Sequence, residues 1–282
     1  MKIFVTGGTG FVGSHFVKRV LQNGHDVIVQ RRPNSMPRIR LANQPKWVDR
    51  ELDKDFSDYL KGCEVVVHFA SHTPNPPYAP LDECIYWNVY ATSRLLQRAA
   101  ELGVEKFLIA GTCFEYGTAA INQNFIHPKT EMRPETSYPI SKAAATTACI
   151  GLARQYNLKM EILRIFQVFG EGEASSRFWP SLREAALNGD DFAMSSGTQI
   201  RDFVNVSDVA EQFTNALEFK GVKNGQPRMR NIGTGNGQTL IEFAQYWWKY
   251  WGAKGQLIPG KKVLRPGEVQ RLVADINSVH LC

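Results

Sequence analysis

Residues 1–13, MKIFVTGGTGFVG, open the chain with an apolar run that breaks into glycines. Lys2 to Thr6 is short and rich in β-branched and aromatic residues, which predicts a buried strand. Ser14 to Leu21 carries apolar residues at helical spacing, which predicts a helix directly after the glycines. Glycines at such a junction allow a tight turn and a close approach to a pyrophosphate, whose charge rests on helix N-terminal amides. The stretch therefore predicts a dinucleotide-binding corner.

Size and composition predict a folded protein that acts on small molecules. The chain has 282 residues, of which 43% are hydrophobic, and a net charge of +6. Its lysines and arginines are dispersed and form no aromatic-basic stripe, so we expect no nucleic-acid partner and a mild preference for acidic substrates. No apolar stretch approaches the ~20 residues that span a bilayer, and the first predicted strand starts at residue 2. We therefore expect neither a membrane association nor a secretory signal.

The cysteine and histidine patterns argue against a disulfide framework and a metal site. The five cysteines are scattered and include no C-x-x-C pair. The histidines show no metal-ligand spacing. We expect a cytoplasmic protein that binds no metal.

Strand and helix patterns alternate through the first half of the chain. We predict strands at 26–30, 46–49, 64–69, 106–110 and 160–166, and helices at 83–102 and 137–156. Such alternation predicts an α/β fold of the Rossmann type, with a doubly wound parallel sheet. Beyond residue 166 the pattern is less regular. We therefore predict a dinucleotide-binding domain at 1–166 and a smaller C-terminal lobe at 167–282, from which residues 199–220 return to the first domain.

Three polar residues near predicted strand ends suggest proton-transfer chemistry. Ligands gather outside the carboxyl ends of the strands in a doubly wound sheet, and Thr112 follows such an end. Tyr138 and Lys142 are four residues apart on a predicted helix, so their side chains share one face. An adjacent ammonium lowers the pKa of a phenol from about 10 by favouring the phenolate. We therefore expect the pair to move a proton to or from a hydroxyl or carbonyl, although a helix-start tyrosine beside a solvated lysine would give the same pattern.

An ordered set of motifs covers nearly the whole chain. The motifs are TGGTGFVG (6–13), VVVHFAS (65–71), Asn88 with Thr92, GTCFEYG (111–117), YPISK (138–142), LR (163–164), RDF (201–203) with Val206 and Asp208-Val209, NIG (231–233) and RPGE (265–268). On these motifs the chain resembles the extended short-chain dehydrogenase/reductases, in the NAD-dependent epimerase/dehydratase group that acts on nucleotide sugars.

The resemblance implies roles for particular residues. It makes Thr112, Tyr138 and Lys142 the catalytic trio, with Tyr138 and Lys142 also in the cofactor site, where Lys142 binds the nicotinamide ribose. The other residues that it places against the cofactor pyrophosphate, adenine, ribose and nicotinamide are Gly7, Gly10, Phe11, Val12, Gly13, Glu51, Leu52, Phe69, Ala70, Ser71, Asn88 and Phe166.

The resemblance also implies a substrate site and an assembly. The C-terminal lobe would bind a nucleotide-diphosphate sugar, with contacts from Thr112, Gln167, Arg201 and Arg265. The two arginines would clamp the diphosphate, a task suited to a planar guanidinium group. For Arg201, a surface ion pair with Asp202 is the competing interpretation. In relatives the helices at 83–102 and 137–156 form a dimer seam, so we expect a homodimer.

The end of the second predicted strand bears on the choice of cofactor. NAD-preferring corners usually carry an acidic residue there, about 20 residues beyond the glycines. This chain has Gln30-Arg31-Arg32 instead. Two guanidinium groups without a nearby carboxylate would pair with a 2′-phosphate, so we predict NADP(H). The alternative is that Arg31 and Arg32 are solvated loop charges and that the cofactor is NAD(H).

The residues after Thr112 bear on the reaction. Relatives that dehydrate carry an Asp-Glu pair directly after the catalytic threonine, whereas this chain has Cys113-Phe114. Our first hypothesis is an NADPH-dependent reduction of the C4 ketone of a nucleotide-linked 4-keto-6-deoxyhexose, a step of deoxysugar biosynthesis. The same trio would serve an NAD-dependent nucleotide-sugar 4-epimerase. A non-catalytic NADP(H)-sensing protein is a third reading, which the presence of both Tyr138 and Lys142 disfavours.

Overall fold

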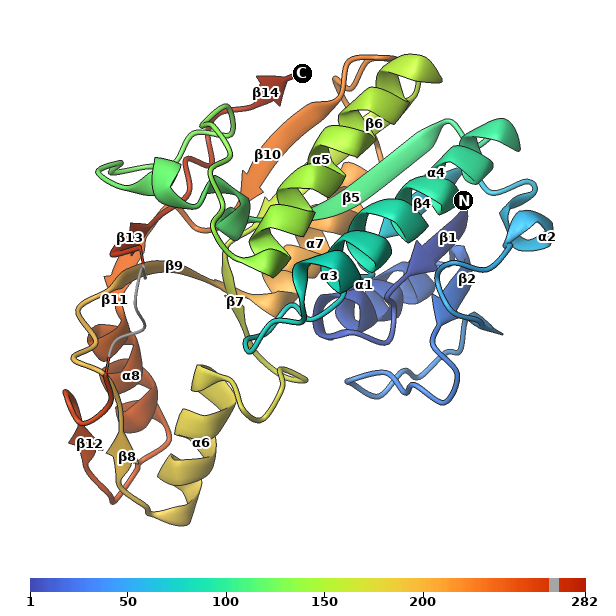
Figure 1. Ribbon diagram of the computed structural model, residues 1–282. Helices are drawn as coiled ribbons and strands as arrows, with labels where there is room; N and C mark the ends of the chain where they lie inside the picture. Colours follow the sequence, from blue (N-terminus) through green and yellow to red (C-terminus); the bar gives the residue numbers. More distant parts are fainter. Residues whose placement is uncertain (264–268) are drawn as a thin grey trace.

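A computed structural model describes residues 1–263 and 269–282 (Figure 1). Its main sheet has eight strands in the order β14-β10-β6-β5-β4-β1-β2-β3, and all neighbours are parallel except β14 and β10. The predicted α/β fold of the Rossmann type is confirmed. The strands of this sheet are β1 (Lys2–Thr6), β2 (Asp26–Arg31), β3 (Lys46–Asp49), β4 (Val65–His68), β5 (Lys106–Thr112), β6 (Lys159–Ile165), β10 (Arg228–Ile232) and β14 (His280–Leu281).

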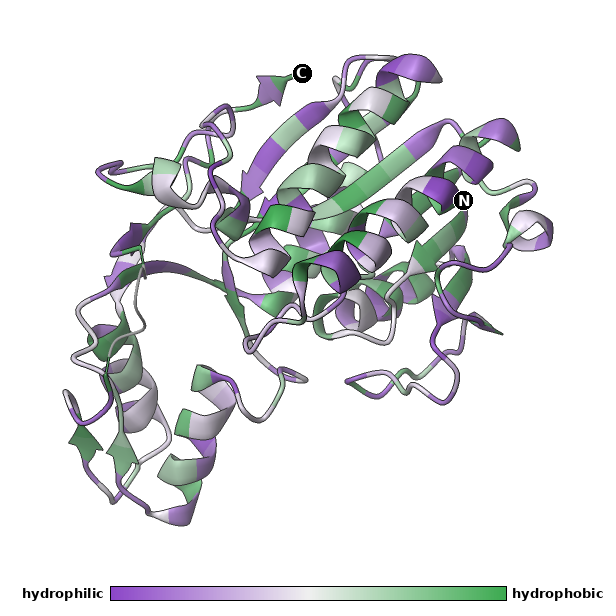
Figure 2. Ribbon diagram, in the orientation of Figure 1, coloured by the Kyte–Doolittle hydropathy of each residue, from purple (hydrophilic) through white to green (hydrophobic). Residues whose placement is uncertain are grey.

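Alternating side chains of the central strands build a core on each face of the sheet. Val5 packs into the cluster that contains Phe16 and Phe213, whereas the adjacent Phe4 packs into the cluster that contains Leu96 and Cys149. Figure 2 shows these central strands as predominantly hydrophobic, as expected when both faces are covered. The covering helices are α1 (Phe11–Gln22) and α7 (Val206–Ala216) on one face, and α2 (Ser57–Leu60), α4 (Thr92–Glu101) and α5 (Ser137–Gln155) on the other.

The helix predicted at 83–102 is interrupted. It consists of α3 (Leu81–Ile85), a π-helical segment η1 (Tyr86–Ala91) and α4. The predicted extent of the helix is confirmed, but the π-helical segment was not predicted, because apolar periodicity reports the buried face and not the hydrogen-bond spacing. Asn88 lies in the π-helical segment with 3% of its surface exposed. Single π turns of this kind occur frequently at functional sites.

The smaller lobe stands apart from the main sheet (Figure 1). Leu182, Met194 and Trp248 are among the buried residues of its core. Between its segments the chain returns to the sheet, because α7 packs on α1 and β10 pairs with β6. The division of the chain at residue 166 stays a prediction. The elements of this half are β7 (Gln167–Phe169), α6 (Phe178–Asn188), β8 (Phe192–Ala193), β9 (Ile200–Asn205), β11 (Gly237–Thr239), α8 (Leu240–Tyr250), β12 (Leu257–Ile258) and β13 (Arg271–Leu272).

Within the described part of the chain, no helix combines the length and the apolar character needed to cross a membrane.

Candidate active site

A cleft of about 860 Å³ runs along the carboxyl ends of the parallel strands. It joins the glycine corner after β1 to the ends of β4, β5 and β6 and to the start of α5. Most of the residues predicted for the site lie together on its wall. These are Gly7, Gly10, Phe11, Val12, Gly13, Arg31, Arg32, Glu51, Leu52, Phe69, Ala70, Ser71, Asn88, Thr112, Tyr138, Lys142, Phe166 and Gln167.

The glycine corner gives a phosphate group both space and the positive end of the α1 helix dipole. A Cβ on Gly7, whose φ is +68°, would lie 2.5 Å from the backbone nitrogen of Ala70, and one on Gly13 would lie 2.2 Å from the Gly7 oxygen. Gly10 caps α1 without a side-chain hydrogen bond, and the first turn of α1 holds no acidic residue. Its N-terminal amides and positive dipole end are therefore available to an anion, and the corner fits a dinucleotide pyrophosphate.

The three predicted catalytic residues are largely buried and line the same cleft. Their exposed fractions are 8% for Thr112, 6% for Tyr138 and 6% for Lys142. Thr112 ends β5, and its Oγ1 accepts a hydrogen bond from the Phe114 amide at 3.3 Å. Tyr138 and Lys142 lie in the first turns of α5. The Lys142 ammonium donates to the Ala110 carbonyl of β5 at 2.9 Å, which ties the helix to the strand.

The pKa of Tyr138 differs from the sequence-based expectation. Burial raises the pKa of Tyr138 well above its usual range, the Glu115 charge adds to the rise, and the Ser71 hydroxyl opposes it. The predicted lowering by Lys142 is therefore not found. Desolvation lowers the pKa of Lys142, and Glu115 opposes that change. With a raised pKa, Tyr138 stays a protonated phenol, which can donate a proton.

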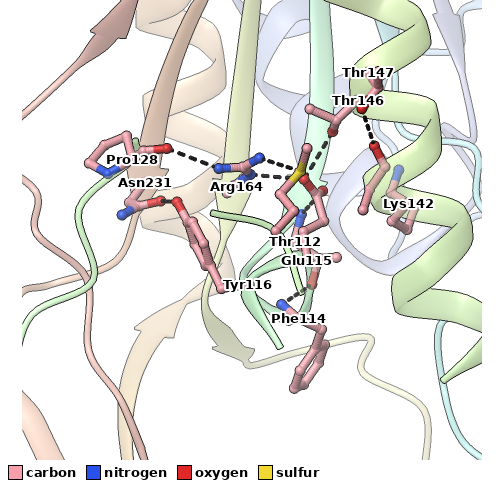
Figure 3. Close-up of polar contacts among 12 residues, drawn as sticks. Thr112, Phe114, Glu115, Tyr116, Pro128, Lys142, Thr146, Thr147, Arg164 and Asn231 are labelled. Carbon is pink, nitrogen blue, oxygen red and sulfur yellow. Dashed lines mark hydrogen bonds and ion pairs between the residues drawn. The ribbon is translucent and has the colours of Figure 1, made fainter. Parts of the chain in front are cut away.

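A buried carboxylate joins the elements that carry the trio. Glu115 accepts hydrogen bonds from the Thr112 amide at 2.9 Å, the Thr146 hydroxyl at 2.9 Å and Arg164 Nε at 2.8 Å (Figure 3). These partners belong to β5, α5 and β6. Tyr116 lies beneath the Arg164 guanidinium and donates to Asn231 Oδ1 at 2.6 Å. The network fixes the strand end at Thr112 relative to the helix that holds Tyr138 and Lys142.

Asn88 anchors the loop that follows β4. Its Oδ1 accepts from the His72 amide at 2.7 Å, and its Nδ2 donates to Ser141 Oγ at 2.8 Å. Ser141 in turn donates to the Tyr138 carbonyl at 2.8 Å. The loop wall of the cleft and the first turn of α5 are thereby joined.

The premise of the NADP(H) prediction was wrong for Arg31. Its Nε lies 2.8 Å from Asp49 Oδ1, and its guanidinium stacks over Trp47. Asp49 lies directly opposite Arg31 in the register of β2 and β3, so a carboxylate already neutralises this charge. Arg32 and the unpredicted Arg38 also line the cleft, and both are exposed.

The predicted substrate residues have different outcomes. Gln167 lines the cleft, whereas Arg201 is not among the lining residues. Arg201 is 7% exposed and donates to the Ile200 carbonyl at 2.8 Å. Burial raises the pKa of the Cys113 thiol to about 12, and the Arg201 charge opposes that rise. Arg265 lies outside the described residues.

Sequence reasoning missed several residues of the cleft. Arg38, His72, Trp87, Glu173 and Arg177 also form its wall. Glu173 and Arg177 follow the strand end at β7, so the rule that ligands gather at carboxyl ends could have singled them out. Arg38 lies on a loop whose path no local pattern predicts.

The model of the NAD dependent epimerase/dehydratase family matches residues 3–233. The chain belongs to this family. It is an NAD(P)-dependent enzyme of the extended short-chain dehydrogenase/reductase type, as the motifs predicted.

Known members show which reactions the family supports. The UDP-glucose 4-epimerase of Corynebacterium glutamicum is 27% identical over 87% of this chain and 79% of its own length. The dTDP-D-glucose 4,6-dehydratase of Mus musculus is 26% identical over 86% of this chain and 71% of its own. The structure of MoeE5 in complex with UDP-glucuronic acid and NAD is 28% identical, with a TM-score of 0.83 over 98% of this chain and 90% of that one.

Proposed function

We propose that this family member oxidises and reduces the C4 position of a nucleotide-diphosphate hexose, with Tyr138 as the proton-transfer group. The observation that carries the proposal is the single cleft that joins the glycine corner to Thr112, Tyr138 and Lys142. A nicotinamide held by that corner supplies a hydride acceptor or donor beside the trio.

The trio divides the proton chemistry at C4 as follows. Thr112 offers a hydroxyl at the end of β5 that holds the C4 oxygen by a hydrogen bond. Tyr138, a phenol that is protonated near neutral pH, gives its proton to an oxygen that gains negative charge, and regains it in the reverse direction. Lys142, fixed to the Ala110 carbonyl and one helical turn from Tyr138 on the same cleft wall, would hold a hydroxyl group of the bound cofactor or substrate.

A 4-epimerase is our first candidate for the net reaction. The two relatives and the solved structure above act on or bind nucleotide sugars, and the relative at 27% identity is a UDP-glucose 4-epimerase. The Asp49 carboxylate that pairs with Arg31 removes part of the positive charge that a 2′-phosphate would need. Gln167, Arg201 and Arg265 remain our candidates for contacts to the substrate diphosphate.

A 4-ketoreductase that uses NADPH is the second candidate. It is favoured by Arg32 and Arg38, two exposed guanidinium groups on the cleft wall, and by Gln30 where NAD-binding corners usually carry an acid. Its substrate would be the nucleotide-linked 4-keto-6-deoxyhexose predicted from the sequence, which places the reaction in deoxysugar biosynthesis.

Product analysis separates the two candidates. Purified protein is incubated with UDP-glucose and NAD⁺, and separately with a panel of CDP-, dTDP-, GDP- and UDP-linked 4-keto sugars and NADPH. A 4-epimerase converts UDP-glucose to UDP-galactose without net consumption of cofactor. A reductase consumes one NADPH for each 4-keto sugar reduced. If neither substrate set gives a product, the proposed chemistry at C4 is wrong.

We further propose a homodimer formed through α3, α4 and α5. The interrupted helix formed by α3, η1 and α4 lies beside α5 across one face of the sheet (Figure 1). Leu81 of α3 and Tyr86 and Tyr90 of η1 are large, exposed apolar residues. A monomeric mass in solution would contradict this. The cysteines are all unpaired, which supports a reducing compartment such as the cytoplasm.

A further inference from the structure

The loop at 170–177, between β7 and α6, reaches across to the cofactor half of the cleft. His15 Nε2 of α1 donates to the Glu171 carbonyl at 2.8 Å. A Cβ on Gly172 would lie 3.1 Å from the Cβ of Arg38, so the two segments are in close contact. Both partners belong to segments that line the cleft near the glycine corner. The loop is therefore held against the part of the cleft that fits a dinucleotide.

Glu173 of this loop is buried and faces the cleft. Its side chain is 6% exposed, and it is one of the residues on the cleft wall. One carboxylate oxygen, Oε1, lies 3.5 Å from Arg177 Nε. The other, Oε2, has no hydrogen-bond partner in the described part of the protein. A buried carboxylate oxygen without a donor carries a desolvation cost, which a donor group on a bound ligand would remove.

The chemistry of Glu173 selects the kind of donor. A carboxylate repels phosphate groups and accepts hydrogen bonds from hydroxyl groups. Burial raises the pKa of Glu173 to about 7, while Arg177 and a hydrogen bond from the Gly170 backbone oppose the rise. In a cleft that fits nucleotides, the vicinal hydroxyl groups of ribose are donors of the required kind.

We propose that Glu173 is a specificity-determining residue whose free carboxylate oxygen accepts a hydrogen bond from a ribose hydroxyl of a bound nucleotide. The inference rests on the proposed function only in that nucleotides occupy the cleft. Both the dinucleotide and the sugar nucleotide carry ribose, and binding measurements distinguish the two.

The test compares Glu173→Ala and Glu173→Gln with Glu171→Ala. Glu171 is exposed, belongs to the same loop and is not on the cleft wall, so its variant is the matched control. The dissociation constants of NADH and of UDP-glucose are measured separately by calorimetry. At pH 8, above the Glu173 pKa of about 7, we expect Glu173→Ala to weaken one of them by about 10-fold or more, the loss typical of a hydrogen bond to a charged group. Glu173→Gln, which keeps an acceptor, should lose less.

The ligand that loses affinity identifies the source of the ribose. The 2′- or 3′-deoxy form of that ligand should bind wild type more weakly than the parent ligand does, by the same factor as the Glu173→Ala loss. Glu173→Ala should bind the deoxy and parent forms with equal affinity. Thermal unfolding confirms that each variant is folded, and Glu173→Gln provides the test if Glu173→Ala is not. The proposal is overturned if neither dissociation constant changes by more than in Glu171→Ala, or if wild type binds neither nucleotide. Because binding is measured, a wrong assignment of the reaction leaves the test valid.

Discussion

Arg164 Nε lies 2.8 Å from Glu115 Oε2, and the two side chains are 1% and 0% exposed. The pair lies directly behind the end of β5. Arg164 also donates to the Pro128 carbonyl at 3.0 Å, so the guanidinium and the carboxylate are both held by several partners (Figure 3). Such pairs contribute little net stability, but the removal of one partner leaves a buried charge without compensation.

Glu115→Gln should therefore destabilise the fold. The amide keeps the shape but leaves Arg164 as an unpaired buried cation, so the free energy of unfolding should fall by about 3–5 kcal/mol. Urea denaturation measures this change. The double variant Glu115→Leu/Arg164→Met removes both charges and should recover part of the loss. A loss below about 1 kcal/mol in Glu115→Gln, within the range of exposed pairs, would show that the pair is not isolated from solvent.

His68 should make the stability depend on pH. The Thr92 hydroxyl donates to the Trp87 carbonyl at 3.2 Å, so His68 Nε2 donates to Thr92, while Nδ1 accepts from the Thr6 hydroxyl at 2.7 Å. Both nitrogens are thus satisfied in the neutral ring. Burial lowers the pKa of His68 from 6.5 to about 3.

Between pH 6.5 and 5 the unfolded state takes up a proton at His68 that the folded state excludes. The free energy of unfolding should therefore fall with falling pH, with a contribution from this residue of up to about 1.4 kcal/mol per pH unit. Urea titrations of wild type and His68→Asn over this range measure the difference in slope. Equal slopes would mean that His68 titrates in the folded protein as it does in the unfolded chain.

Arg32 and Arg38 should discriminate between the two cofactors, and Arg31 should not. Calorimetric titration gives the affinity for NADPH relative to NADH. Replacing Arg32 and Arg38 together by alanine should lower this ratio by about 10-fold or more, because each contact to a charged group contributes roughly 1.5–3 kcal/mol. The control, Arg31→Gln/Asp49→Asn, removes an ion pair that is already neutral. A larger effect of the control than of the double alanine variant would contradict the assignment.

The fold could be predicted from local sequence because its strands are buried on both faces. Val65-Val66-Val67 is apolar throughout, and consecutive side chains enter opposite cores. The strand ends of a parallel sheet meet at one edge, so Gly7, Thr112 and Tyr138 could be placed in one site before the structure was known.

Local sequence patterns could not predict the contacts between side chains that are far apart in the sequence. Arg31 and Asp49 are 18 residues apart and meet only through the register of β2 and β3. Glu115 follows a strand end like many exposed glutamates, and nothing local shows that Arg164 and Thr146 enclose it. The direction of the Tyr138 pKa shift depends on how the folded chain buries the phenol. The four-residue spacing to Lys142 shows only that the two side chains share a helix face.

The central claim, that Tyr138 transfers the proton at C4, is tested most directly by rapid mixing of the NAD⁺-loaded enzyme with UDP-glucose. The absorbance of the reduced nicotinamide reports hydride transfer from C4. Wild type should show it, while Tyr138→Phe should lose at least about 100-fold in the rate, the typical contribution of an acid-base group, and should bind NAD⁺ with unchanged affinity. Equal rates in the two proteins would contradict the account, and if wild type does not reduce the nicotinamide with UDP-glucose, equal rates of NADPH oxidation with a 4-keto sugar would contradict it in the same way.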